Sequence, residues 1–299
     1  MEELELVSIA VDKHTKATMA RNTATLSSIF MRAFDLHRQS EVSDQRVLSL
    51  AQLGQVETVV NNVALKMIYK LNDASFRPIF VQWIEWASTL LGKKDRSGKN
   101  LRRQSLYGFL GVFFDKLGSV VTSYSIYIME DAAKVLQELD IKKAAGEREL
   151  WRRVLKTLAH CFQHDKDDFW QSPAHFAAVA PILVEQFLHA PVLDLTEDLV
   201  PAVVELAAAA DSQEHQKELN TAILKHLRSE NPAVRLAAVK AEQALAQRLG
   251  EEWLGMLPEM LPYISELQED DDEVVERETM RWIVMIEKVL GESLDSMLQ

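Results

Sequence analysis

NPAVRLAAVKAEQALAQRLGE, residues 231–251, returns 41 residues later as DEVVERETMRWIVMIEKVLGE, residues 272–292. Apolar positions coincide in this register, with Val234 on Val275, Val239 on Met280 and Leu245 on Ile286, and Leu-Gly-Glu closes both copies. The match is imperfect, since Arg248 falls on Val289. A helical self-match at about 40–47 residues is typical of proteins built from stacked helix pairs. The repeat therefore predicts an all-α fold, an α-solenoid with long surfaces rather than one cleft.

The first copy has the features of a helix packed between two neighbours. Asn231 is a capping residue and Pro232 suits the first helical position. Val234, Ala238, Ala241, Leu245 and Leu249 form one apolar stripe. The alanines allow close approach of neighbouring backbones, and the Asn turn followed by Val-Arg and small residues resembles the second helix of a HEAT repeat. The second copy has Glu276 where the first has Arg235, as expected of a terminal repeat. The predicted fold class is a HEAT-repeat α-solenoid of stacked antiparallel helix pairs.

Composition and charge restrict the class of function. The chain has 299 residues, 47% of them hydrophobic, and a net charge of −12. An acidic chain does not favour non-specific nucleic-acid binding, which depends on Lys and Arg. The single cysteine, Cys161, excludes an internal disulfide framework and fits a reducing compartment. The sequence indicates neither a signal peptide nor a membrane span, so no membrane partner is expected.

Helical patterns follow one another along the chain with no long linker. We expect residues 1–15 to be an N-terminal extension or partial helix and residues 16–299 to form a single solenoid. Asp73 and Ser75 are candidate caps for a helix with Pro78 in its opening turn, and residues 92–100 read as the clearest loop. The other predicted helices cover 17–38, 44–71, 101–117, 120–139, 147–164, 197–210, 214–228, 232–249, 251–268 and 273–290, and one begins at Ser172-Pro173.

Catalytic chemistry has little support in the sequence. The motifs GxSxG, GxxxxGK[ST] and GxGxxG are all missing. His160 and His164 share a helix face with Cys161 between them, which leaves a metal-dependent enzyme as an alternative. No glutamate follows His160 as HExxH requires, and a helix end with an inert buried thiol explains the three residues equally well. We predict no catalytic residue, no cofactor, no metal and no small-molecule substrate.

Two basic clusters are candidates for contact with RNA or a protein partner. The first comprises Lys93, Lys94, Arg96, Lys99, Arg102 and Arg103, and the second includes Arg152 and Arg153. Loops at one edge of a solenoid line up, so the clusters could merge into a patch for RNA phosphates. The alternative is a solvated loop with ordinary surface arginines.

The last part of the chain has the opposite charge. Between Glu266 and Gln299 there are 11 acids and only Arg277, Arg281 and Lys288 as cations. Asp270, Asp271, Asp272, Glu273 and Glu276 form a candidate acidic docking surface for a basic partner. The acids before residue 273 also suit the positive end of the last helix, and this structural role explains them by itself. Trp83, Trp86, Phe109, Phe113 and Phe114 occur at helical spacing and are expected to be core rather than a base-stacking surface.

Several sequence blocks are distinctive. SFRPIF at 75–80 is followed by WIEWA at 83–87, and RQSLY at 103–107 and FFDKL at 113–117 extend this block. WLGMLPE at 253–259, EDDDEVVE at 269–276 and VLGESL at 289–294 stand near the end of the chain. The first block resembles the FRPLF…DWA of the large HEAT-repeat proteins of the small-subunit processome (the Utp-ten or HEAT repeat-containing protein one family), and the last three look like that family's extreme C-terminus. The resemblance covers about residue 40 to the end.

The resemblance implies a C-terminal fragment of a much larger solenoid. It implies a non-enzymatic scaffold in the nucleolus that takes part in rDNA transcription and pre-18S rRNA processing. Other processome proteins are then expected partners, with pre-rRNA or small nucleolar RNA as a direct contact in an alternative reading. A generic HEAT-repeat interaction scaffold is a further alternative. The family has no known catalytic residues, so none is transferred to this chain.

Overall fold

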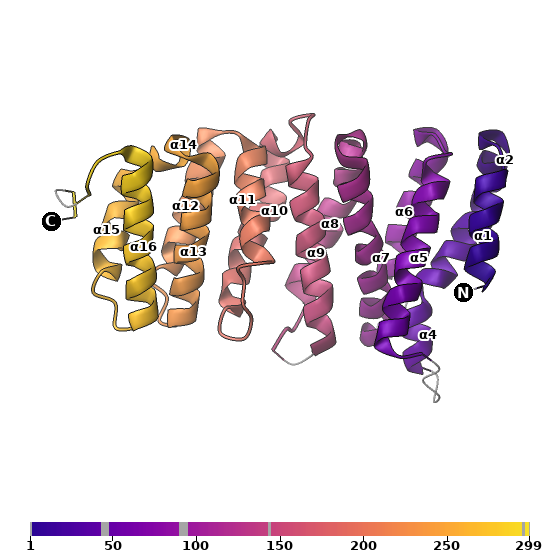
Figure 1. Cartoon of the computed structure of the whole chain (residues 1–299), viewed down its shortest axis with the longest axis horizontal. Helices are drawn as coiled ribbons and strands as arrows, with labels where there is room; N and C mark the ends of the chain where they lie inside the picture. Colours follow the sequence, from indigo (N-terminus) through magenta and orange to yellow (C-terminus); the bar gives the residue numbers. More distant parts are fainter. Residues whose placement is uncertain (1, 43–47, 90–94, 143–144, 295–296, 299) are drawn as a thin grey trace. The chain divides into compact units, whose positions relative to one another are not determined.

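The computed structural model describes residues 2–42, 48–89, 95–142, 145–294 and 297–298. Its residues divide into two compact units by their internal contacts. Unit 1 comprises Met1–Leu117 and Gly146–Thr157, and unit 2 comprises Gly118–Ala145 and Leu158–Gln299. The described residues form helices and contain no strand, in agreement with the predicted all-α class (Figure 1).

The helices predicted at the repeat in unit 2 have the predicted bounds. Helix α13 spans Pro232–Leu249 and α16 spans Glu273–Leu290, 41 residues apart at both ends. Asn231 caps α13 by accepting from the amide of Ala233, and Asp272 caps α16 by accepting from the amides of Val274 and Val275. Each helix ends at a glycine of positive φ, which lacks the Cβ that disfavours such a backbone. The two copies of the sequence repeat therefore form equivalent helices, with N-terminal caps and closing glycines at equivalent positions.

Unit 2 stacks these repeats as helix pairs. Helices α11 (Leu199–Ala210), α13 and α16 pack on one another in succession. Helix α12 (Gln213–His226) packs on α10 (Pro173–Glu185) and α13, while α15 (Leu257–Leu267) packs on α16. The pairs α10–α11, α12–α13 and α15–α16 thus form the layered arrangement that defines a HEAT-type solenoid.

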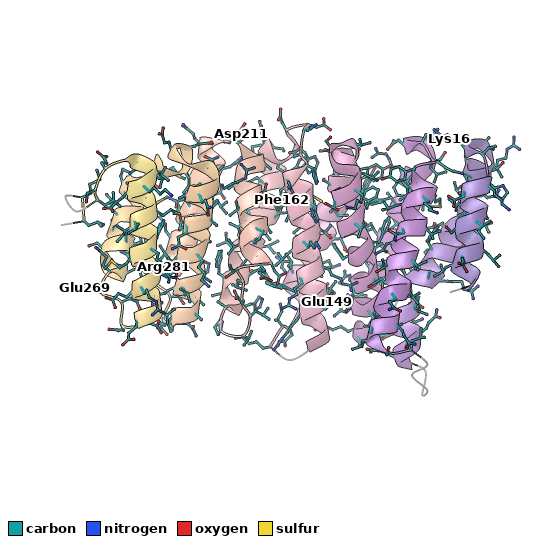
Figure 2. The ribbon with its side chains drawn as sticks, viewed as in Figure 1. Lys16, Glu149, Phe162, Asp211, Glu269 and Arg281 are labelled. Carbon is teal, nitrogen blue, oxygen red and sulfur yellow. The ribbon has the colours of Figure 1, made fainter. Side chains whose placement is uncertain are left out.

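Small side chains line the α11–α13–α16 stack, as the alanine-rich sequence predicts. Ala207, Ala238 and Ala241 are completely buried, which allows the helix backbones to lie close together. Figure 2 shows side chains filling the spaces between the helices. One pair of the repeat departs from the expected equivalence: Val239 is fully buried, whereas Met280 is 41% exposed. The reason is that α13 packs between two helices and α16 covers only one neighbour in this stack.

Unit 1 has an aromatic core. Trp83 of α6 (Asp73–Thr89) lies edge-on to Phe34 of α3 (Thr23–Phe34), with ring centroids 5.3 Å apart, and to Phe109 of α7 (Arg96–Leu117) at 5.4 Å. Its indole N–H donates to Ser27 at 3.0 Å. The predicted core aromatics Trp83, Trp86, Phe109, Phe113 and Phe114 are all buried, so the core interpretation is confirmed and these rings are not available to stack on bases.

The remaining helices of unit 1 correct several predicted boundaries. The stretch predicted as one helix over 17–38 is divided into α2 (Lys16–Arg21), α3 and α4 (Leu36–Val42), with breaks at Asn22 and Asp35. The N-terminal extension contains α1 (Glu2–Lys13), and α5 spans Leu50–Ile68. Pro78 lies inside α6 rather than in its opening turn.

Unit 2 contains further elements. They are the 3-10 turns η1 (Gly118–Tyr124), η2 (Phe169–Gln171) and η3 (Gln186–His189), and helices α8 (Ser125–Glu138) and α14 (Glu251–Leu254). The helix predicted over 251–268 is two helices, α14 and α15. Helix α9 spans Ala145–Gln163 and contributes residues to both units. Across the described parts of the chain, every helix is too short or too polar to cross a bilayer.

Candidate interaction surfaces

The first basic cluster lies on a helix rather than on a loop. Helix α7 begins at Arg96, so the stretch predicted as a loop over 92–100 is helical from Arg96 onward, and Lys93 and Lys94 lie outside the described residues. Asp95 explains the early start, because its carboxylate accepts the amide of Gly98 at 2.8 Å and caps the first turn. By helical spacing Arg96, Lys99 and Arg103 share one side of α7, and Arg102 points about 100° away from Arg103. Their environments differ along the helix, because Arg96 is exposed in the first turn whereas Arg103 is buried two turns later.

Arg102 is held inside unit 1 by a carboxylate and an aromatic ring. Its Nε donates to Asp35 at 2.5 Å, and its guanidinium lies over the ring of Trp86, 4.6 Å from the centroid. Burial opposes ionisation of Asp35, but bonds from Arg38, Arg102 and Gln39 outweigh it and lower the pKa of Asp35 to about 2. The charge of Arg102 is thus already neutralised by a permanently ionised partner.

Arg103 is 1% exposed, and its Nε lies 3.4 Å from the hydroxyl of Ser88. A side chain this buried is inaccessible to an RNA phosphate in the folded unit. The expectation that Arg103 contacts RNA is therefore wrong. The reason is that this position lies on a buried side of α7, in line with the buried Leu106 and Leu110.

Arg153 is also committed within unit 1. Its guanidinium donates to both carboxylate oxygens of Glu57, at 2.7 and 3.0 Å, and to Glu149 at 2.7 Å. Burial lowers the pKa of Arg153, and its bonds to Glu57 and Glu149 outweigh that effect and raise the pKa. A Cβ at Gly108 would lie 2.5 Å from the Arg153 guanidinium, so this close approach requires glycine.

The two basic clusters do meet, but an acid lies between them. Glu147, in the first turns of α9, accepts from Asn100 at 3.1 Å and pairs with Arg96 at 3.4 Å. Arg152 is exposed on α9 and Lys99 is half-buried on α7. Of the described cations predicted to contact RNA, Arg96, Lys99 and Arg152 therefore keep access to solvent, and RNA contact by them stays a prediction.

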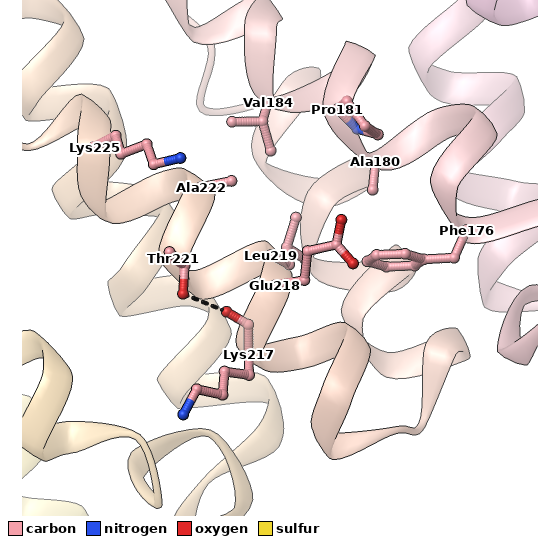
Figure 3. A pocket seen from close by; sticks show the side chains of 10 residues that line it. All are labelled: Phe176, Ala180, Pro181, Val184, Lys217, Glu218, Leu219, Thr221, Ala222 and Lys225. Carbon is pink, nitrogen blue, oxygen red and sulfur yellow. Dashed lines mark hydrogen bonds between the residues drawn. The ribbon is translucent and has the colours of Figure 1, made fainter. Parts of the chain in front are cut away.

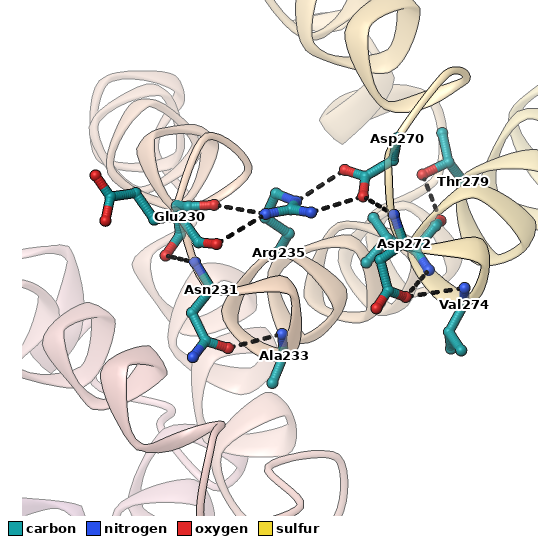
Figure 4. Close-up of polar contacts among 10 residues, drawn as sticks. Glu230, Asn231, Ala233, Arg235, Asp270, Asp272, Val274 and Thr279 are labelled. Carbon is teal, nitrogen blue, oxygen red and sulfur yellow. Dashed lines mark hydrogen bonds and ion pairs between the residues drawn. The ribbon is translucent and has the colours of Figure 1, made fainter.

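The acidic segment is partly structural. Asp270 accepts two bonds from the guanidinium of Arg235, at 2.8 and 2.6 Å, and Asp272 caps α16 (Figure 4). Arg235 also donates to the carbonyl of Ser229 at 2.8 Å, so it joins the loop before α13 to the loop before α16. Burial opposes ionisation of Asp270, but the bonds from Arg235 and from the amide of Asp272, with the charge of Arg235, together outweigh it and lower the pKa of Asp270.

Three acids of the predicted docking surface remain accessible. Asp271 and Glu273 are exposed and Glu276 is half-buried. The structural role expected of the acids before the last helix is confirmed for Asp272, because its carboxylate receives the first amides of α16. The docking role of the accessible acids stays a prediction.

A titratable group that the sequence does not reveal lies in the core of unit 2. Glu242 of α13 is fully buried, and the indole N–H of Trp253 donates to it at 2.9 Å. Burial raises the pKa of Glu242 to about 8, more than the indole bond lowers it. Its place in the helical pattern, between the buried Ala241 and Leu245, was the available signal, but a Glu is normally read as exposed.

The residues of the metal alternative lie at the end of α9. The rings of His160 and His164 stack with their centroids 6.3 Å apart. Cys161 is buried, and burial raises the pKa of its thiol well above the ordinary value. A thiol kept protonated is a poor nucleophile and a poor metal ligand, which agrees with the structural interpretation of Cys161.

A surface groove of about 320 Å³ separates α10 from α12 (Figure 3). Phe176, Ala180, Pro181, Val184 and Leu219 line its apolar part. Lys217 and Lys225 lie at its sides, and the hydroxyl of Thr221 donates to the backbone carbonyl of Lys217 at 2.8 Å. The groove can receive an apolar side chain. The hydroxyl of Thr221 donates to a backbone carbonyl rather than to a side-chain base that would activate it as a nucleophile.

These features define a helical-repeat protein whose stacked helix pairs offer extended surfaces. Residues 18–170, just over half of the chain, match the family described as the BP28CT (NUC211) domain, and the chain belongs to this family. The resemblance drawn from the sequence is thereby confirmed.

Relatives are similar to this chain along its whole length. The chain is 62% identical over 300 residues to U3 small nucleolar RNA-associated protein 10 of Chaetomium globosum, and the match covers 100% of this chain and 17% of that protein. The same-named protein of Neurospora crassa is 57% identical over 299 residues, covering 100% and 16%. The chain thus spans about one sixth of the length of these relatives. Among solved structures, a designed armadillo repeat protein is similar with a TM-score of 0.44 and 14% identity, covering 85% of this chain and 99% of that one.

Proposed function

We propose that the chain is a non-enzymatic scaffold of ribosome biogenesis that works in the nucleolus as part of a small-subunit processome component. The observation that carries the proposal is the 62% identity, across the whole chain, to a U3 small nucleolar RNA-associated protein. Stacked helix pairs support it, because such a fold presents long surfaces for partners. The expected partners are other processome proteins, and the expected outcome is processing of the precursor to 18S rRNA.

Removal of this segment from the full-length protein tests the scaffold role. Cells whose only copy lacks residues 1–299 of this chain should accumulate unprocessed 18S precursor, measured by northern blotting. The tagged intact protein should co-purify with U3 RNA and lie in the nucleolus. The matched control is the intact protein with Val120→Asp, a change at a residue that is 82% exposed. Normal processing without the segment, together with exclusion of the intact protein from the nucleolus, would refute the proposal.

Direct RNA binding is a second candidate. Its support is that Arg96, Lys99 and Arg152 of unit 1 keep access to solvent, and that Glu147 joins the first turns of α9 to those of α7. Exchanging Arg96, Lys99 and Arg152 for Glu should weaken binding of a pre-rRNA fragment. The slope of log affinity against log salt should fall by about one for each phosphate that is no longer neutralised. The control exchanges Lys134, Lys166 and Lys225 for Glu, which changes the net charge equally at other exposed positions. Equal binding by both triple variants would eliminate this candidate.

The acidic docking surface is a proposal for a basic protein partner. Asp271 and Glu273 are its fully exposed members, since Glu276 is half-buried and the carboxylates of Asp270 and Asp272 are bonded within unit 2. Asp271→Lys with Glu273→Lys should abolish binding of that partner while the free energy of unfolding stays within about 0.5 kcal/mol. Retention of all processome proteins by the double variant in affinity purification would contradict it.

A further inference from the structure

One face of α16 carries apolar and cationic side chains together. Arg277, Met280, Arg281, Val284 and Lys288 follow the spacing that places residues on one side of a helix, and we refer to them as the α16 outer face. Val284 is 64% exposed, Met280 is 41% exposed and the side chain of Arg281 is 67% exposed; Arg281 is labelled in Figure 2. Glu273, in the first turn, lies on the same side by its spacing.

The repeat indicates what this face does elsewhere in unit 2. The residues 41 positions earlier on α13 are Leu236, Val239, Lys240, Gln243 and Gln247. There Val239 is fully buried, and the side-chain amide of Gln243 donates to the backbone carbonyl of Glu278 in α16 at 3.0 Å. Gln243 therefore lies on the side of α13 on which α16 packs, whereas Lys240 donates to Thr196 before α11. By the same register, Val284 of the α16 outer face, the equivalent of Gln243, lies where a further helix would pack.

Charge distinguishes the α16 outer face from its counterpart. Arg277, Arg281 and Lys288 are the only cations between Glu266 and Gln299, against 11 acids, and all three lie on this face. Arg281 bonds Glu278 at 2.9 Å, whereas Arg277 and Lys288 form no ion pair with any residue that the structure describes. The α13 counterpart has a single cation, Lys240. A cationic face within the most acidic segment of an acidic chain is complementary to a negatively charged partner.

We propose that the α16 outer face binds an acidic amphipathic helix of a protein partner, which packs on α16 as α16 packs on α13. Its apolar stripe covers Met280 and Val284, and its carboxylates pair with Arg277, Arg281 and Lys288. The proposal rests on the scaffold role and gives that role a defined surface. Two other occupants fit less well. A second copy of this face would oppose like charges, and RNA would leave two exposed aliphatic side chains against phosphates, on a face with no aromatic ring for stacking.

Site-specific photocrosslinking tests the proposal in the full-length protein. A photoreactive benzoylphenylalanine replaces Val284 in cells, with the same residue at Val120 as the control, and the crosslinked peptides are sequenced by mass spectrometry. The expected adduct at position 284 is a partner segment with net negative charge and apolar residues every three to four positions. The control site should not crosslink to that segment.

A synthetic peptide of the crosslinked segment then provides the quantitative test with the purified chain. Fluorescence anisotropy should show binding that weakens with salt and falls at least about tenfold in Val284→Asp and in Arg277→Glu/Arg281→Glu, as for loss of a central anchor. Val120→Asp and Lys134→Glu should bind unchanged, and circular dichroism should show equal helix content in all variants.

Several outcomes would overturn the proposal. In the crosslinking experiment, they are adducts of position 284 with RNA, a second copy, another part of the same chain or a segment without net negative charge, and the absence of any adduct. In the peptide experiment, it is an affinity that Val284→Asp leaves unchanged. Failure of the scaffold role is distinguishable, because it appears as normal 18S precursor processing while the peptide still binds the α16 outer face.

Discussion

Glu242 shows how a single carboxyl ties the stability of unit 2 to pH. The side chain is fully buried and its pKa is raised by burial to about 8. In the unfolded chain the same group titrates near its ordinary value of 4.5. The folded state therefore binds more protons between these two values, and the free energy of unfolding falls as pH rises through that window. The contribution of Glu242 is fully present below about 4.5 and is lost as pH passes 8.

Glu242→Gln should remove this pH dependence. The amide keeps the shape of the side chain and an acceptor for the indole of Trp253, but it never ionises. At pH 8.5 the variant should be more stable than the parent by about 4–5 kcal/mol, given about 1.4 kcal/mol for each pKa unit, and at pH 5 the difference should be below about 1 kcal/mol. Urea unfolding at pH 5, 7 and 8.5 measures the difference, with the exposed Glu218→Gln as control. Parallel pH profiles for the parent and Glu242→Gln would disprove the assignment.

Arg102 and Arg152 look alike in the sequence but should respond differently to mutation. Arg102→Ala removes the bond to Asp35 and the stacking on the Trp86 ring, so the free energy of unfolding should fall by about 2–3 kcal/mol. Arg152 is exposed, and Arg152→Ala should change that free energy by less than about 0.5 kcal/mol. Differential scanning calorimetry of the two variants decides, and equal melting temperatures would refute the structural role of Arg102.

The pairing of these side chains marks the limit of sequence reasoning about the candidate site. Arg102 meets Asp35 across 67 residues, and Arg153 meets Glu57 across 96. A local charge run carries no information about such distant partners, so cations that neutralise buried acids cannot be told from cations that face solvent. The acids near Asp272 were better predicted, because a cap acts on its own helix within a few residues.

At the scale of elements, the two glycine ends of the repeat are not equivalent. Gly291 has φ 74° and ψ 14°, the left-handed helical conformation, whereas Gly250 has φ 61° and ψ −132°. The second conformation lies outside the regions open to residues with a Cβ. Space is not the difference, because a Cβ at either glycine would meet nothing within 4 Å.

Gly250→Ala should therefore destabilise unit 2 more than Gly291→Ala. The change at Gly291 should cost about 1 kcal/mol, the usual penalty for alanine in the left-handed region, and the change at Gly250 about 2 kcal/mol or more. Denaturant unfolding of both variants, read from tryptophan fluorescence, provides the measurement. A larger loss for Gly291→Ala would show that local contacts rather than backbone conformation decide these ends.

Helix boundaries were predictable where caps and repeats agree, and less so elsewhere. For α13 and α16 the capping residue, the apolar stripe and the closing glycine all point to the same ends. The break at Asp35, between α3 and α4, has no such signal. Its carboxylate points inward and accepts bonds from Arg38 of α4 and Arg102 of α7. The start of α7 was missed because Gly98 suggests a loop, although Asp95 three residues earlier is the cap that overrides it.

At the scale of the molecule, the stack in unit 2 predicts how damage spreads. Leu245 of α13 and Ile286 of α16 are equivalent in the repeat and fully buried. Leu245→Ala and Ile286→Ala should each destabilise unit 2 by about 2–5 kcal/mol. Because α13 packs on both α11 and α16, Leu245→Ala should accelerate amide exchange in all three helices. Ile286→Ala should affect mainly α15 and α16, as expected of nearest-neighbour coupling.

Hydrogen exchange with mass spectrometry separates these two patterns. The control is Val284→Ala, which alters an exposed side chain on the same helix as Ile286. Equal spread of faster exchange from Leu245→Ala and Ile286→Ala would show that unit 2 unfolds as one cooperative block rather than repeat by repeat.

The bond between Arg235 and Asp270 has a mechanical consequence. A stack of helix pairs bends through small changes in the angle between neighbouring pairs. The two charge-assisted bonds tie the loops at one edge of the α13–α16 junction, so bending that opens this edge must break them, while bending that closes it need not. The junction is therefore stiffer in one direction than in the other, and tension that opens this edge is resisted by the guanidinium of Arg235 in addition to the packing of α16 on α13.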